Sequence, residues 1–323
     1  MVTKYKEELR VITEAFLAKE IDYLDLSNAT KAYKNFLSKL SIFKLEDEGA
    51  RKDLFLDSGV AIGTTWAAMC IDDFMRTKRF IQGVFQAIED LRATKTGTLH
   101  VFYAGTGPYA TLILPLLTHY SPEDIQFSLL EINPISFNNV KNVIENLECN
   151  EYVREFIKAD ATKYQFDEEV EVDLMVSETM LKGLRREQQV PIVINLMQQL
   201  PETTLLIPQR IEINLVYHKT GIEKRLTKKI STVLDFTKNS KYSGNGLEFP
   251  AQTITLPRAN RNNYHLLCLA TTIQVYKDFY LREGNSGLTT MVKIKEIEEI
   301  ENYKEVTMQY KVSKFPDFEY QFN

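Results

Sequence analysis

The stretch HVFYAGTGPYATLILPLLTHYSPEDIQFSLLE, residues 100–131, decides the fold class of this chain. It begins with a short apolar run (100–105), continues through a segment (108–120) that we read as a helix, and ends in a second apolar run (125–131). Apolar runs of this length are typical of strands that are buried on both faces. The stretch therefore predicts a β-α-β unit of a parallel sheet, whose ligands bind at the carboxyl ends of the strands.

The same alternation continues beyond residue 131. A helical stretch at 134–147 and another at about 185–200 separate three more apolar runs: VREFIKAD (153–160), VDLMVSE (172–178) and TTLLIPQ (203–209). We therefore expect an α/β fold, with a Rossmann-like, doubly wound domain over residues 64–209.

The segments upstream of this sheet have helical spacing. Residues 1 to about 48 carry apolar side chains three to four positions apart: Leu9, Ile12, Phe16 and Leu17. The segment 64–91 predicts one helix, bent near Thr77, with apolar side chains along one face: Trp66, Met69, Phe74, Phe80, Val84 and Ile88. We expect residues 1–63 to form an N-terminal helical lead-in, and the aromatic side chains of the long helix to lie in the core.

From about residue 210 the pattern changes to alternation of apolar and polar residues. The segments RIEINLVYH, TTIQVY and TTMVKIKEI lack a long helical period. They predict a smaller, mostly β carboxyl-terminal domain over residues 210–323, which would serve the substrate or dimerisation. The polar stretch Thr237–Asn245 predicts a loop.

Four successive strands end in residues that suit a nucleoside cofactor. The first leads into Gly105-Thr106-Gly107-Pro108, where a cofactor can approach backbone that carries no side chain. The second ends in Glu131, which is placed to accept hydrogen bonds from both hydroxyls of a ribose. The third ends in Asp160, which we expect to face an adenine, and the fourth ends in Ser177-Glu178.

A nicotinamide cofactor is an alternative, because a strand-tip acid can bind the ribose of any adenosine. The glycine pattern, however, is G-T-G-P-Y, and Tyr109 and Ala110 follow where a diphosphate-binding loop would place its third glycine. Taken singly, Glu131 also fits a solvated helix cap before Asn133-Pro134, and Asp160 fits an ordinary turn aspartate.

Two glutamates, Glu178 and Glu187, stand nine positions apart in VDLMVSETMLKGLRRE (172–187). On one helix this spacing would put them on opposite faces, so cooperation requires a turn, which we place at Gly183. We expect Arg185-Arg186-Glu187 to begin the next helix. Taken alone, Glu187 fits a first-turn helix residue favoured by the helix dipole.

This segment resembles the double-glutamate loop of the protein arginine methyltransferases. Asp73-Phe74-Met75-Arg76-Thr77 is similar to the D-x-x-R-T segment of that family, and the 105–108 loop to the G-x-G-P form of its symmetric-dimethylating branch. The resemblance covers roughly residues 64–218. It implies an S-adenosylmethionine-dependent methyltransferase, whose cofactor-binding residues are Arg76, Gly105, Thr106, Gly107, Glu131, Asp160, Ala161 and Glu178.

The resemblance further implies that Arg76 contacts the methionyl carboxylate of the cofactor and Glu178, and that Glu178 and Glu187 are catalytic. A guanidinium is planar and carries five donors, so two carboxylates can grip it through charge-assisted, partly bidentate hydrogen bonds. The expected acceptor is therefore arginine, an arginine-like metabolite, or a peptide or protein arginine. Without the family resemblance, Arg76 also fits an exposed pair with Asp72 or Asp73.

The chain departs from the family at three places, one of which is that no obvious dimerisation arm lies between the sheet and the carboxyl-terminal part. No Thr-His-Trp element occurs in the carboxyl-terminal part, where His218 and His265 lie in VYHK and NYHLL, and Tyr103 stands where the family has an acid before the glycine loop. These departures favour a small-molecule acceptor over a protein. Two alternatives stay open: a methyltransferase for another small nitrogen, oxygen or carbon nucleophile, and a non-catalytic cofactor-binding subunit.

Composition excludes several other classes. The three cysteines, Cys70, Cys149 and Cys268, are widely spaced, which argues against a disulfide framework or a metal site and favours buried thiols. A net charge of −5 disfavours a nucleic-acid surface, and no apolar run approaches the ~20 residues of a membrane span. The charged amino terminus lacks the apolar core of a signal peptide, so we expect a cytoplasmic protein, with a homodimer as one candidate assembly.

Overall fold

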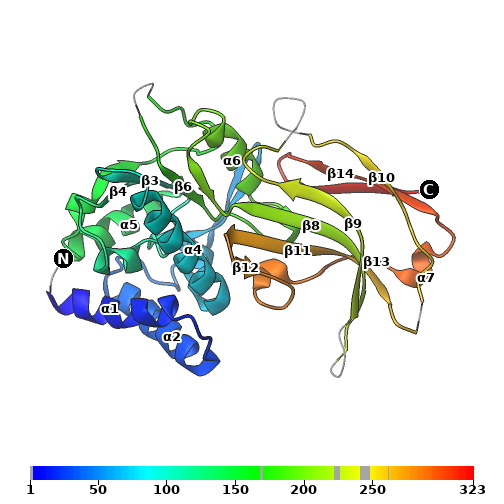
Figure 1. The fold of residues 1–323 in the computed structure, drawn as a ribbon, viewed down its shortest axis with the longest axis horizontal. Coiled ribbons are helices and arrows are strands. Elements are labelled where there is room, and N and C mark those ends of the chain that lie inside the picture. Colours follow the sequence, from blue (N-terminus) through cyan, green and yellow to red (C-terminus); the bar gives the residue numbers. More distant parts are fainter. Residues whose placement is uncertain (1–2, 168–169, 222–225, 241–247, 261) are drawn as a thin grey trace.

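The computed structural model describes residues 3–167, 170–221, 226–240, 248–260 and 262–323. Figure 1 shows a parallel sheet with its helices at one end of an elongated molecule and antiparallel sheets at the other end. The α/β fold class that the sequence predicts is confirmed. Residues 241–245 of the expected loop at 237–245 lie outside the described residues.

The parallel sheet contains the five predicted strands, in the order β5-β4-β3-β6-β7. Their bounds are Leu99–Ala104 (β3), Ile125–Leu130 (β4), Val153–Ile157 (β5), Leu174–Ser177 (β6) and Leu205–Ile207 (β7). All six residues of β3 are buried, which is why its sequence reads as an unbroken apolar run. Since β4 pairs with one edge of β3 and β6 with the other, the strand order reverses at β3, and this is where such sheets bind ligands.

The helix expected at 134–147 is confirmed as α5 (Pro134–Asn146), whose first turn is capped by the side chain of Asn133. The prediction of a helix at 108–120 is wrong. The chain there makes turns and one short 3₁₀ helix, η3 (Leu114–Thr118). Ala110 adopts a left-handed φ of 47°, and Pro115 has no N–H to donate, so an α-helix cannot run through this segment.

The prediction of a single helix at 64–91 is also wrong. This segment is divided into α3 (Thr64–Met69), η2 (Cys70–Asp72) and α4 (Phe74–Arg92). The break falls at Asp73, whose side chain accepts a hydrogen bond from the backbone N–H of Arg76 and so starts a new helix there, not at Thr77. Phe80, Val84 and Ile88 of α4 are buried as expected.

The break also changes which side chains face the core. Trp66 and Met69, on the short α3, are 45% and 41% exposed, contrary to the prediction of one buried face, and Phe74 is only partly buried. The indole N–H of Trp66 instead donates to the carbonyl of Arg51 at 3.1 Å. A one-face pattern drawn through a break cannot predict burial, since η2 and the new helix start at Asp73 interrupt the helical spacing between α3 and α4.

The N-terminal helices are α1 (Thr3–Leu17) and α2 (Tyr23–Lys39). The periodic residues Leu9, Ile12 and Phe16 are buried, which confirms the helical lead-in. The ammonium group of Lys78 on α4, itself buried, donates to the carbonyls of Phe16 and Ala18 at 2.9 and 2.7 Å. Burial lowers the pKa of Lys78 to about 8, and its contacts tie the end of α1 to the helix that carries Arg76.

The carboxyl-terminal region is mostly β, as predicted. One antiparallel sheet contains Arg210–Lys219 (β8), Leu226–Phe236 (β9), Leu266–Tyr276 (β11), Phe279–Leu281 (β12) and Val292–Glu296 (β13). A second contains Gln252–Thr255 (β10), Glu305–Lys311 (β14) and Asp317–Phe322 (β15). The remaining elements are the hairpin Leu54–Leu56 (β1) and Gly59–Ala61 (β2), α6 (Gln189–Met197), α7 (Ile297–Ile300), η1 (Glu48–Arg51), η4 (Asn150–Tyr152), η5 (Lys182–Leu184) and η6 (Gly287–Thr289).

Candidate functional site

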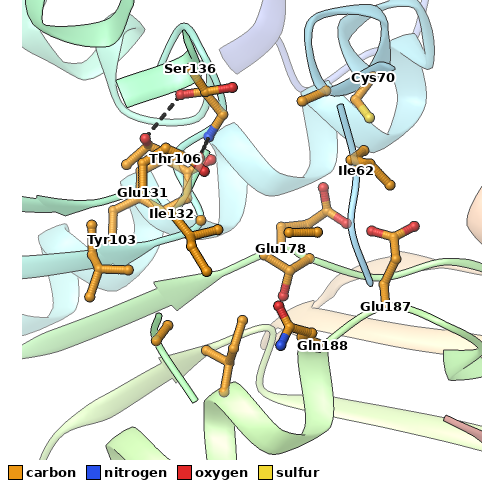
Figure 2. A pocket seen from close by; sticks show the side chains of 18 of the residues that line it. Ile62, Cys70, Tyr103, Thr106, Glu131, Ile132, Ser136, Glu178, Glu187 and Gln188 are labelled. Atoms are coloured by element: carbon orange, nitrogen blue, oxygen red, sulfur yellow. Dashed lines mark hydrogen bonds between the residues drawn. The ribbon is translucent and has the colours of Figure 1, made fainter. Parts of the chain in front are cut away.

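A cavity lies where β3, β4 and β6 end. Figure 2 shows Glu178 and Glu187 at one side of it and Glu131 with Thr106 at the other. Eight of the nine predicted site residues line this cavity: Arg76, Gly105, Thr106, Gly107, Glu131, Ala161, Glu178 and Glu187. Residues that the sequence scatters over more than a hundred positions therefore meet at one edge of the sheet.

The glycine loop turns sharply after β3. Gly105 and Gly107 have φ values of +75° and +59°, a region that glycine adopts readily and other residues rarely do. A Cβ at Gly105 would lie 2.3 Å from Cγ2 of Thr179, which follows Glu178 on the neighbouring strand end. Glycine at 105 is thus required by the backbone and by the close approach of the double-glutamate loop.

Glu131 is buried, with 6% of its surface exposed, so the alternative of a solvated cap is wrong. Its Oε2 accepts the backbone N–H of Gly107 and its Oε1 that of Asn133, both at 2.8 Å. Burial raises the pKa of this carboxyl to about 6, against the lowering effect of the hydrogen bonds. Because each carboxylate oxygen has a second lone pair, Glu131 can still accept hydrogen bonds from a ligand beside the glycine loop.

Asp160 differs from the other strand-tip residues. Its Oδ1 accepts hydrogen bonds from the backbone N–H and the hydroxyl of Thr162, at 2.9 and 2.7 Å, as in an ordinary aspartate turn. Its neighbours Ala159 and Ala161 line the cavity. The third strand end therefore presents small apolar side chains to the cavity, and the contact of Asp160 with an adenine stays a prediction.

Arg76 and Glu178 form an ion pair in which the side chains are only 14% and 6% exposed. The Nε of Arg76 donates to Oε2 of Glu178 at 2.7 Å, and Nη2 donates to the same oxygen. The alternative of an exposed pair is wrong, since Asp72 pairs with Lys34 instead, at 2.6 Å.

The second carboxylate oxygen of Glu178, Oε1, takes no part in the ion pair with Arg76. Oε1 is buried, and among the described residues it has no hydrogen-bond partner. A buried carboxylate oxygen in this condition is costly unless a donor reaches it. Burial raises the pKa of Glu178 to about 7, although Arg76 acts in the opposite direction.

Glu187 does not belong to a helix, contrary to the prediction that residues 185–187 begin one. Arg186 has a left-handed φ of 66°, Glu187 makes an isolated β-bridge with Val60, and α6 begins only at Gln189. Figure 2 shows the carboxyl groups of Glu178 and Glu187 side by side in the cavity. Burial raises the pKa of Glu187 to about 7, with further contributions from the negative charges of Glu178 and Asp53.

Two residues of this site were missed from the sequence. The buried amide of Gln189 accepts the backbone N–H of Thr179 at 2.8 Å and donates to the carbonyl of Ser177 at 3.0 Å, so it fixes the strand end that carries Glu178. The thiol of Cys70 lines the cavity from η2, where burial raises its pKa. Neither residue belongs to a motif, and only their positions in space reveal them. The expectation of buried thiols holds for Cys149 and Cys268, while Cys70 is partly exposed.

No protein-family model matches the chain, and no curated protein matches its sequence. Among solved structures, it is similar to one described as the Trypanosoma brucei PRMT1 enzyme-prozyme heterotetrameric complex with AdoHcy. The match has a TM-score of 0.56 at 10% sequence identity, and covers 79% of this chain and 91% of that one. The chain shares the fold of that protein. An identity this low shows the fold alone.

The described residues contain no group of three histidine, cysteine, aspartate or glutamate side chains that could hold a metal ion. No helix within the described ranges is long and apolar enough to cross a membrane.

Proposed function

We propose that this protein binds S-adenosylmethionine in the cavity and transfers its methyl group to a guanidino nitrogen. The observation that carries the proposal is the buried Oε1 of Glu178, which has no hydrogen-bond partner in the described part of the chain and lies beside a second buried carboxyl group, that of Glu187. A cationic ligand with several N–H donors would satisfy both groups. A neutral nucleophile would leave one buried charge uncompensated.

The cofactor half of the cavity fits this proposal. Glu131 can accept hydrogen bonds from ribose hydroxyls next to the backbone of Gly107. Arg76 uses Nε and Nη2 for Glu178, and its positive charge lines the cavity, where it can attract a carboxylate such as that of the methionyl group. The neighbour of the same fold was solved with AdoHcy, which supports the assignment.

The two glutamates have two tasks in the proposed reaction. When bound, S-adenosylmethionine supplies an electrophilic methyl group on sulfur. Glu178 and Glu187 hold the planar guanidinium so that one terminal nitrogen faces that methyl group, and most of the acceleration comes from this alignment. A carboxyl group whose pKa is raised to about 7 is also a suitable acceptor for the proton that the methylated nitrogen loses.

Arginine, an arginine-like metabolite and a peptide arginine all carry the required group. Since no Thr-His-Trp element is present, we propose a small-molecule acceptor first and a peptide second. We also retain the three-part division at residues 63 and 209, a cytoplasmic location and a homodimer as proposals. Methylation of another nitrogen, oxygen or carbon nucleophile, and a non-catalytic subunit, are the outcomes that the following experiment distinguishes.

The test has two stages. Isothermal titration calorimetry measures binding of S-adenosylmethionine, S-adenosylhomocysteine and NAD; binding of NAD alone would overturn the cofactor assignment. Mass spectrometry then follows transfer of a labelled methyl group to arginine, its hydroxylated and amidino relatives, and arginine-rich peptides. Transfer only to a non-guanidino compound would retain the fold and cofactor but remove the acceptor, and binding without any transfer would favour the non-catalytic subunit.

A further inference from the structure

The segment that carries Glu187 has an unusual backbone. Gly183, Leu184 and Arg186 all have left-handed φ values, of 72°, 56° and 66°. Two of these residues have side chains, for which this conformation is unfavourable. The turn therefore needs contacts from outside to keep its shape.

Those contacts come from the carboxyl-terminal sheets. The backbone N–H of Gly183 donates to the hydroxyl of Thr271 on β11 at 3.1 Å. The carbonyl of Leu184 accepts the hydroxyl of Tyr310 on β14 at 2.6 Å, and the N–H of Arg186 donates to the carbonyl of Pro316 at 2.7 Å. Three of the four residues from 183 to 186 are thus held through their backbone by a part of the chain more than eighty positions away.

Tyr310 is the most confined of these groups. It is 1% exposed and packs edge-on against Phe249 and Phe318, with ring centroids 5.7 and 5.2 Å away. The aromatic packing fixes its ring, so its hydroxyl holds the carbonyl of Leu184 in one place. Glu187 follows three residues later, with its carboxyl group in the cavity.

The start of α4, the helix that carries Arg76, is also hydrogen-bonded to the carboxyl-terminal region. Asp73 receives hydrogen bonds from the hydroxyl of Ser286 at 2.6 Å and from the N–H of Gly287 at 2.8 Å. The other oxygen of Asp73 accepts the N–H of Arg76, the partner of Glu178. The segment that carries Glu187 and the helix that carries Arg76 are therefore both attached to the carboxyl-terminal region.

We propose that Tyr310 is a positioning residue for methyl transfer: its hydroxyl holds the 183–186 turn and thereby sets the place of Glu187 relative to Glu178. This inference rests on the proposed function. It gives the β region a part in catalysis that its distance in sequence from the glutamates conceals.

The chain offers a matched control for the substitution Tyr310→Phe. Tyr217 on β8 is 2% exposed, and its hydroxyl also donates to a backbone carbonyl at 2.6 Å, that of Pro257, which does not line the cavity. Tyr310→Phe and Tyr217→Phe each remove one hydrogen bond from the hydroxyl of a buried tyrosine to a backbone carbonyl, so both should lower the melting temperature. Only the first loosens the turn before Glu187.

The wild type is first tested with arginine and with an arginine-rich peptide. Steady-state kinetics of the variants are then measured with the acceptor that the wild type methylates. We expect Tyr310→Phe to lower kcat/KM for this acceptor roughly tenfold, because a small misplacement of a clamping group is costly. Its affinity for S-adenosylhomocysteine should stay within about twofold of the wild type. Water that reaches Glu187 should also move the acid limb of the pH profile to lower pH. Tyr217→Phe should change neither kcat/KM, nor the affinity for S-adenosylhomocysteine, nor the acid limb of the pH profile.

Hydrogen exchange followed by mass spectrometry gives a readout that needs no turnover: Tyr310→Phe should speed exchange of the amides at 183–187, and Tyr217→Phe should not. Wild-type kinetics for Tyr310→Phe, or an equal loss in both variants, would overturn the positioning role. If the wild type methylates neither acceptor, the guanidino function itself fails and the role of Tyr310 in catalysis fails with it.

Discussion

Replacing Glu187 by Gln tests the guanidinium clamp most directly, because the change keeps the size of the side chain and removes only its charge. Glu178 remains to hold Arg76, so the cofactor half of the cavity is left intact. Hydrogen bonds to a charged group are worth about 1.5–3 kcal/mol and those to a neutral group about 0.5–1.5 kcal/mol. With two donors of the acceptor on Glu187, we expect a loss of about 2 kcal/mol, or roughly thirtyfold in kcat/KM.

The same substitution has a predictable effect on stability. The pKa of Glu187 is raised to about 7 in the folded protein, from an ordinary value of 4.5. The folded state therefore binds more protons than the unfolded state between these values. The stability that this group contributes is present below pH 4.5 and is lost as pH rises through 7. Since Gln does not ionise, Glu187→Gln should be more stable than the wild type at pH 8, by about 3 kcal/mol for a pKa raised from 4.5 to about 7, and equal to it below pH 4.5.

The assay combines kinetics with thermal melting at pH 5 and pH 8. Glu202→Gln, at an exposed glutamate on the turn before β7, is the matched control and should change neither activity nor the pH dependence of melting. Near-wild-type turnover of Glu187→Gln on the genuine acceptor would remove this carboxylate from the clamp. A loss of activity together with a loss of S-adenosylhomocysteine binding would instead indicate collapse of the cavity.

Three further predictions concern the same cavity. Because burial raises the pKa values of Glu178 and Glu187 to about 7, acceptor kcat/KM should rise with pH through 7 and then level off, and a flat profile from pH 5 to 9 would contradict this. Glu131→Ala should weaken S-adenosylhomocysteine binding by about 1–3 kcal/mol in calorimetry; unchanged affinity would exclude the ribose contact. Gly105→Ala should lower the free energy of unfolding by about 1–3 kcal/mol in urea titration, whereas Gly49→Ala, where a Cβ meets no atom within 4 Å, should have little effect; equal losses would refute the special role of Gly105.

The sequence by itself determined the parallel sheet and the set of residues at its edge. Buried parallel strands must be apolar throughout, so runs such as 100–105 and 172–178 are readable without a structure. Functional groups follow these runs because only the strand ends open to a ligand. The placement of Glu131 and Glu178 could therefore be predicted from the end of an apolar run.

The sequence could not give the local path of the chain between strands. Asp73 breaks one apparent helix because its carboxylate caps the next, while Ala110 and Pro115 prevent another helix. Apolar residues keep their helical spacing across such breaks. The pattern therefore predicted one long helix at 64–91 and a helix at 108–120, where the structure has shorter elements. Burial of Trp66 was overestimated for the same reason.

Only the tertiary structure decided how Glu178 and Glu187 are held in the cavity. The left-handed turn at 183–186 is unfavourable in isolation, and it keeps its shape through Thr271, Tyr310 and Pro316, none of which stands near it in sequence. The raised pKa values of Glu178 and Glu187 likewise arise from burial among several segments, and it is the fold that buries Oε1 of Glu178 away from any hydrogen-bond partner among the described residues. Local sequence fixes which groups are present, whereas their spacing and charge depend on long-range packing, which no local pattern encodes.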